Sequence, residues 1–149
     1  MEWIILFFGN WIIFLLLVDW RGLKINIWSG LLAILAATVV DFCNTVHGRY
    51  MINRPVISVF NSSLFFLIGP VFVIGTLFAQ YHPKKRWLII LNVLVIFTLY
   101  SFVELTLVAR GAVEYIKWNF LDSVLVNISV ITMLSWFSIV VLKKWGIRR

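Results

Sequence analysis

Three acidic side chains carry the chemistry that this sequence offers: Asp41, Glu104 and Asp122, each set within or beside a long apolar stretch. A carboxylate near hydrocarbon is costly unless it faces a protein interior, so an intramembrane acid marks a candidate functional site. Carboxylates that share a site of low dielectric bind a cation or retain a proton, because each charge disfavours ionisation of the other. We therefore expect a polar pocket around these acids.

Polar residues flank the acids at helical spacing. Tyr100 and Ser101 precede Glu104 by four and three residues, within reach for hydrogen bonding on a helix. The expected ligand or ion pocket comprises Asp41, Asn44, His47, Tyr100, Glu104 and Asp122. The basic residues that could pair with these acids from nearby segments are Arg49, Arg54 and Arg110.

Several roles fit such a pocket. Arginines that enter it would pair with the acids and lock helices together, whereas a pocket without arginine would hold a proton or a cation. A metal ion would combine the carboxylates with the imidazole of His47, but no dense ligand motif such as HExxH supports one, and the metal stays unassigned. An intramembrane enzyme would use Glu104 or His47 as its base. No nucleophile stands out, so we assign no catalytic residue, and we expect no cofactor.

The composition is that of an integral membrane protein. Hydrophobic residues make up 62% of the chain and charged residues 13%, with a mean hydropathy of +1.01, whereas soluble domains carry roughly 25% charged residues. The net charge of +7 comes from short basic clusters between apolar runs. Such clusters indicate membrane topology, so we expect no nucleic-acid partner.

Five apolar runs predict an all-α fold, a bundle of five transmembrane helices in one membrane domain that covers residues 1–149. Gly69-Pro70 lies in the middle of the third run, where proline removes a hydrogen bond and kinks a helix. The expected spans are 2–18, 26–46, 57–80, 87–109 and 119–142.

Small residues form a stripe along the second span. At 100° per residue, one narrow helix face carries Gly30, Ala33, Ala37, Asp41 and Asn44. Small side chains let neighbouring helices approach closely, so this face is expected inside the bundle. We expect it to pack against the fourth and fifth spans, and Asp41 therefore to point inward.

The basic residues predict the orientation. Nine Lys and Arg residues lie in the first and third loops and the C-terminal tail, against four in the second and fourth loops. Because cytoplasmic loops are enriched in Lys and Arg, we expect the N-terminus outside and the C-terminus inside. This orientation places all three acids of the expected pocket in the outer half of the bilayer.

Short motifs in a fixed order resemble a family of small uncharacterised membrane proteins that occur mainly in endospore-forming Bacillus- and Clostridium-type bacteria. The motifs are YHPKKRW at 81–87, FVE at 102–104, EYIKW at 114–118 and VVD at 39–41, where such proteins tend to carry Glu. An Arg-Pro pair precedes the third span, but in a longer loop than the family shows. The resemblance implies an all-helical fold in a bacterial cell membrane and implies no chemistry.

These observations lead to three expectations about function. The first is a small multi-pass protein with an outer-side acidic pocket, acting without catalysis as a binding protein or a component of a membrane complex. Its partners would be the lipid bilayer and either another membrane protein or a second copy of the chain. The alternatives are a small ion- or proton-coupled transporter acting as an oligomer, and an intramembrane enzyme that uses a carboxylate base.

Overall fold

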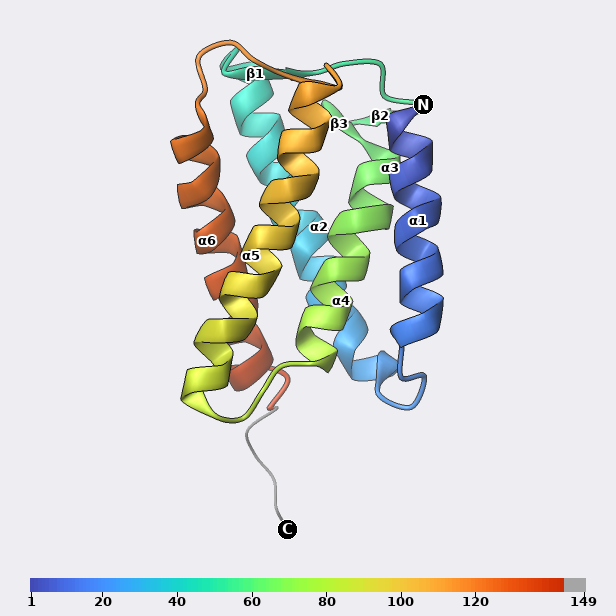
Figure 1. Cartoon of the computed structure of the whole chain (residues 1–149), viewed down its shortest axis with the longest axis vertical. Helices are drawn as coiled ribbons and strands as arrows, with labels where there is room; N and C mark the ends of the chain where they lie inside the picture. The colour runs from blue at the N-terminus through green and yellow to red at the C-terminus, as the bar shows by residue number, and fades with distance from the viewer. Residues whose placement is uncertain (144–149) are drawn as a thin grey trace.

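The computed structural model describes residues 1–143, and over this range the chain is mostly helical, with five helices side by side (Figure 1). The expected helical fold is confirmed. Three of the five, α2, α5 and α6, are long and apolar enough to cross a membrane. The helices are α1 (Glu2–Leu17), α2 (Leu23–Val46), a third helix built of α3 (Leu64–Phe66), η1 (Leu67–Val71) and α4 (Phe72–Gln80), α5 (Arg86–Ala109) and α6 (Phe120–Val140).

The third helix begins at Leu64, seven residues later than the 57 expected from hydropathy. The preceding residues form a hairpin of β2 (Ser58–Val59) and β3 (Ser62–Ser63), which pair antiparallel. Its two turn residues, Phe60 and Asn61, have φ of 49° and 61°. Positive φ at both positions is the turn that suits the twist of a two-residue hairpin. This apolar stretch therefore turns back on itself before the helix starts.

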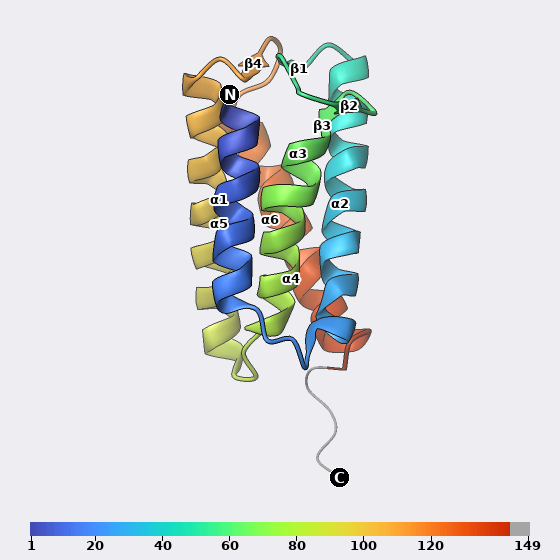
Figure 2. The same ribbon diagram turned by 90° about the vertical axis from the view of Figure 1, so that its right-hand side faces the viewer.

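A second pair of strands covers one end of the bundle, which we call the cap end (Figures 1 and 2). β1 (Tyr50–Ile52) follows α2, and β4 (Val113–Tyr115) follows α5; they pair antiparallel with Tyr50 opposite Tyr115. The Arg49 carbonyl also accepts hydrogen bonds from two backbone amides just after β4. The loops after α2 and α5, expected as separate segments, are therefore joined and hold two tyrosines side by side.

The third helix lies at the centre of the bundle and is kinked where the sequence predicts (Figure 2). Gly69 has φ −93° and ψ −105°, outside the helical range, directly before Pro70. The indole of Trp11 on α1 donates to the neighbouring Ile68 carbonyl at 3.1 Å. A Cβ added to Gly69 would lie 3.0 Å from the Phe7 Cα, so α1 approaches the kink closely. A side chain at this position would therefore have to displace the α1 backbone.

The small-residue stripe of α2 packs mainly against α4, with further contacts to α6. A Cβ on Gly30 would lie 2.2 Å from the Thr76 Oγ1, and one on Gly75 would lie 2.6 Å from the Ala33 Cβ. Most of the stripe is buried as expected, with Ala37 half-buried, and its expected contact with the fifth span is found through α6. Its main partner, however, is the third helix and not the fourth. Both helices carry their smallest residues at this crossing, which permits the closest approach of the two backbones.

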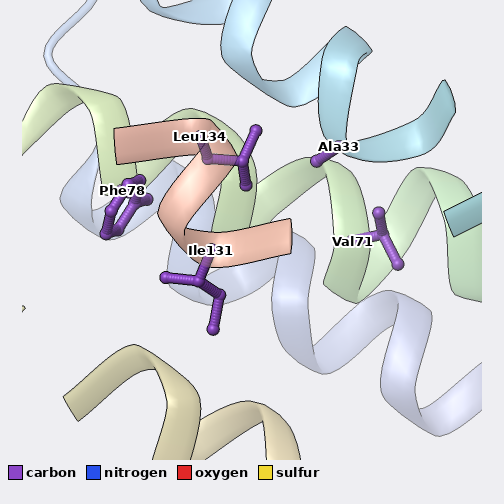
Figure 3. Close-up of a cluster of buried hydrophobic side chains, with 5 residues drawn as sticks. All are labelled: Ala33, Val71, Phe78, Ile131 and Leu134. Carbon is purple, nitrogen blue, oxygen red and sulfur yellow. The ribbon is translucent and has the colours of Figure 1, made fainter. Parts of the chain in front are cut away.

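Buried apolar side chains from four segments meet in the middle of the bundle (Figure 3). Partly buried residues of α5 pack against this cluster from the side. The rest of α5 is exposed and apolar, with Trp87 75% and Phe102 70% accessible. A surface of this kind is suited to lipid contact. The central cluster consists of Ala33, Val71, Phe78, Ile131 and Leu134.

Candidate functional site

Asp41 lies on α2 near the cap end and is buried, 9% accessible. Its Oδ1 accepts a hydrogen bond of 2.6 Å from the Tyr50 hydroxyl, and its Oδ2 accepts one of 2.5 Å from the Ser62 hydroxyl. Tyr50 belongs to β1 and Ser62 to β3, so the two irregular loop segments supply both donors. Each carboxylate oxygen is therefore held by an uncharged group.

Glu104 on α5 is held in the same way by groups from β4 and α6. Its Oε1 accepts hydrogen bonds from the Tyr115 hydroxyl at 2.5 Å and from the Ser123 hydroxyl. Its Oε2 accepts a hydrogen bond of 2.8 Å from the Asn127 amide. The indole of Trp118 donates to the Ser123 Oγ at 2.7 Å, which fixes that hydroxyl. All four of these donors are neutral.

The two acids line one cavity of about 70 Å³. A water molecule needs roughly 10–15 Å³ by this measure, so the space admits a few waters or a small polar group. Tyr100 also lines the cavity, and among residues 1–143 its hydroxyl has no hydrogen-bond partner. The polar and aromatic side chains of the wall are Trp3, Asp41, Tyr50, Phe66, Tyr100, Glu104, Tyr115, Trp118, Ser123 and Asn127.

None of the three candidate arginines forms an ion pair with either acid in the part of the chain that the structure describes. Arg49 donates to the Asn44 Oδ1 at 3.1 Å, and its guanidinium lies 5.9 Å from the centre of the Trp118 ring. Arg54 and Arg110 line a separate cavity of about 460 Å³ beside the N-terminus. Within residues 1–143, the ion pair found joins the N-terminal amine to Glu2, and none includes Asp41 or Glu104. The acids therefore have no cationic partner in the described part of the chain.

Three of the expected pocket residues lie outside the cavity. The Asn44 amide donates to the Val40 carbonyl at 2.8 Å, and the exposed His47 bonds through Nδ1 to the Cys43 carbonyl at 2.6 Å. Asp122 forms a capping box with Asn119, and its side chain accepts a hydrogen bond of 3.0 Å from the Asn119 backbone N–H. A residue at this third helical position is commonly used to cap its own helix. The structure brings together Asp41, Tyr100 and Glu104 and leaves the other three apart.

Sequence reasoning missed most of the donors. Ser123 and Asn127 are four residues apart on α6, a spacing that places both on one face and could have indicated a shared partner. Tyr50, Ser62 and Tyr115 lie in loop strands whose pairing has no signal in hydropathy. Ser101, expected beside Glu104, is buried, and its hydroxyl has no hydrogen-bond partner among the described residues.

Electrostatics keep the two cap tyrosines in their neutral, donating form. Burial raises the pKa of Tyr50, and the neighbouring Asp41 carboxylate raises it further. Burial and the hydrogen bond to Glu104 likewise raise the pKa of Tyr115. A phenol that donates to a carboxylate resists deprotonation, because ionisation would place two negative charges together. Both tyrosines therefore remain donors through the physiological pH range.

The described residues contain no group of three or more His, Cys, Asp or Glu side chains placed to hold a metal ion. The four residues considered for a metal site are dispersed: two line the cavity, His47 faces the exterior and Asp122 caps α6. The arrangement instead offers two carboxylates and several aromatic rings around a small space. It is suited to a compact group that carries positive charge.

Neither a family model nor a curated protein nor a solved structure matches this chain. No family model therefore supports the resemblance to small membrane proteins of endospore-forming bacteria. The three long apolar helices are consistent with a small multi-pass membrane protein.

Proposed function

We propose that all five helices form one membrane domain, with the cap end outside and the C-terminus inside, in a bacterial cell membrane. The helices alternate in direction, and the loops opposite the cap carry the larger share of Lys and Arg. Helix α1 has 16 residues and the third helix, Leu64–Gln80, has 17. Both are short for the hydrocarbon core of a bilayer, which is about 30 Å thick. A bilayer accommodates apolar helices of this length by local thinning at modest cost.

We further propose that the acidic cavity binds a small molecule through a positively charged group and that the protein acts without catalysis. One observation carries this proposal: Asp41 and Glu104 line one cavity and are held by neutral donors only. Burying a carboxylate without a cationic partner is costly. A cationic ligand would supply that partner, and the ring faces of tyrosine and tryptophan would add cation–π attraction.

The test is calorimetric titration of ethylammonium chloride into the purified protein. Asp41→Asn combined with Glu104→Gln should raise the Kd by about tenfold or more, because a buried cation loses both of its charged partners. The matched control is Glu114→Gln, which removes an exposed acid beside the pocket on β4. The control should bind as the wild type does. Equal affinity of the wild type and the double variant would refute the proposal.

A further inference from the structure

A second cavity of about 70 Å³ lies deeper in the bundle, next to the acidic one. Its wall is formed mainly by apolar side chains from α2, η1, α4, α5 and α6, among them Ala37, Ile96 and Leu134. The two cavities share five wall residues, so they meet. The shared residues are Val40, Asp41, Tyr100, Val126 and Asn127.

The joined cavities change from polar to apolar along one axis. On α2, the walls extend from Asp41 through Ala37 to Ala33. The eight steps along the helix from residue 33 to residue 41 span about 12 Å at 1.5 Å each. One end is bounded by the carboxylates and the cap tyrosines, and the other by Phe78 and Leu134. Apolar walls around empty space forgo dispersion contacts that a hydrocarbon group would restore.

Tyr100 lies where the two cavities meet, and its side chain gives independent support for a bound ligand. The ring packs against Phe66 with centroids 6.2 Å apart, and the side chain is half-buried. Within the described chain, its hydroxyl has no hydrogen-bond partner although it lines both cavities. A phenol hydroxyl can both donate and accept a hydrogen bond, so a polar ligand atom in the cavity would give it a partner.

We propose that the ligand is an amphiphile, with a cationic head between Asp41 and Glu104 and an alkyl chain in the deeper cavity. This inference rests on the proposed function and adds the chemical class of the ligand. The head would pair with the two carboxylates and donate a hydrogen bond to the Tyr100 hydroxyl, while the chain would lie among the side chains of α2, α4 and α6. Lipid-like amines and hydrophobic ammonium compounds belong to this class.

The experiment compares ethyl-, butyl- and hexylammonium by calorimetric titration of detergent-solubilised protein, with the free amine concentration measured. Each buried methylene contributes about 0.8 kcal/mol, so the Kd should fall about fourfold per methylene that enters the deeper cavity. Ala37→Leu should fill that cavity and remove most of this dependence on chain length. The matched control is Val39→Leu, which adds bulk at a position of α2 that is 53% accessible.

The chain-length series on the wild type is decisive even if Ala37→Leu fails to fold. Equal affinity for all three amines would overturn the amphiphile and leave the cationic pocket intact. No binding of any amine would refute the pocket itself. Hexanol, titrated in parallel, should bind at least tenfold more weakly than hexylammonium. Equal binding of the alcohol would show that the acids do not recognise the head and would also overturn the inference.

Discussion

The hydroxyls around Asp41 are as important to its site as the carboxylate itself. Tyr50 and Ser62 are buried at 7% and 0% accessibility, and both donate to Asp41. A buried hydroxyl that loses its acceptor keeps its desolvation cost without the bond that offset it. The site is thus a small hydrogen-bonded unit that links α2 to β1 and β3.

Replacing Asp41 separates the role of shape from that of hydrogen bonding. Asp41→Leu strands the Tyr50 and Ser62 hydroxyls, and we expect a loss of about 1–3 kcal/mol in the free energy of unfolding for each. Asp41→Asn retains an acceptor, and the hydroxyls can reorient, so the loss should be well below that of the leucine variant. Equilibrium unfolding in detergent measures both values. Equal losses would show that these hydrogen bonds do not stabilise the fold.

Tyr115 makes the free energy of unfolding depend on pH in the alkaline range. Because burial and Glu104 raise its pKa in the folded state, the folded protein keeps a proton that the unfolded chain loses near pH 10. The stabilisation is therefore complete below about pH 10 and is lost as the pH rises above it. Tyr115→Phe should flatten this decline in unfolding free energy between pH 9 and 11. An unchanged slope in the variant would contradict the assignment.

At the scale of elements, the close crossing of α2 and α4 positions the pocket. Gly30 and Ala33 contact Thr76 and Gly75 at distances that leave no room for larger side chains. Asp41 is two to three turns further along α2, so the crossing sets where its carboxylate lies relative to β3 and α5. The kink at Gly69 and the β1–β4 pair then bring the donors to it.

Two glycine-to-alanine changes test this crossing. In Gly30→Ala, the new Cβ would lie 2.2 Å from the Thr76 Oγ1 and 2.9 Å from the Phe72 carbonyl oxygen, so we expect a loss of about 1–3 kcal/mol. Gly9 on α1 has no neighbouring atom within 4 Å of an added Cβ. Gly9→Ala should therefore gain up to about 1 kcal/mol of helix stability. The midpoints of thermal denaturation of the two variants should shift in opposite directions. A shift in the same direction would argue against the close crossing.

Over the described residues, the interior combines apolar clusters with many polar side chains, and the exterior is largely apolar. Buried positions include Asn26, Ser29, Thr76 and Ser138, whereas the exposed surface of α1 and α5 is dominated by Ile, Leu, Phe and Trp. In a bilayer, lipid chains remove the hydrophobic advantage of burying apolar groups. Helices associate instead through small residues and polar contacts. This distribution agrees with membrane spans in contact with lipid.

Cysteine labelling tests the proposed orientation. In a Cys43→Ser background, a membrane-impermeant maleimide should modify Glu114→Cys on the cap from outside intact cells. It should modify Lys84→Cys, in the loop at the opposite end, only after permeabilisation. The C-terminal tail, expected inside, extends over residues 144–149 and lies outside the described residues, so position 84 is the better reporter. The reverse pattern would place the acidic pocket on the cytoplasmic side.

The amino-acid sequence by itself determined the apolar composition typical of a membrane protein, the five helices, the kink at Gly69-Pro70 and the burial of most of the small-residue stripe. These properties follow from composition, the length of apolar runs and local spacing, which depend on residues close together in the chain. Only the tertiary structure decided that α4 covers the stripe, that β1 pairs with β4, and that Tyr50, Ser62, Tyr115 and Ser123 hold the acids. Those contacts join segments distant in the chain, and a side chain's partner depends on which helix ends lie together in space.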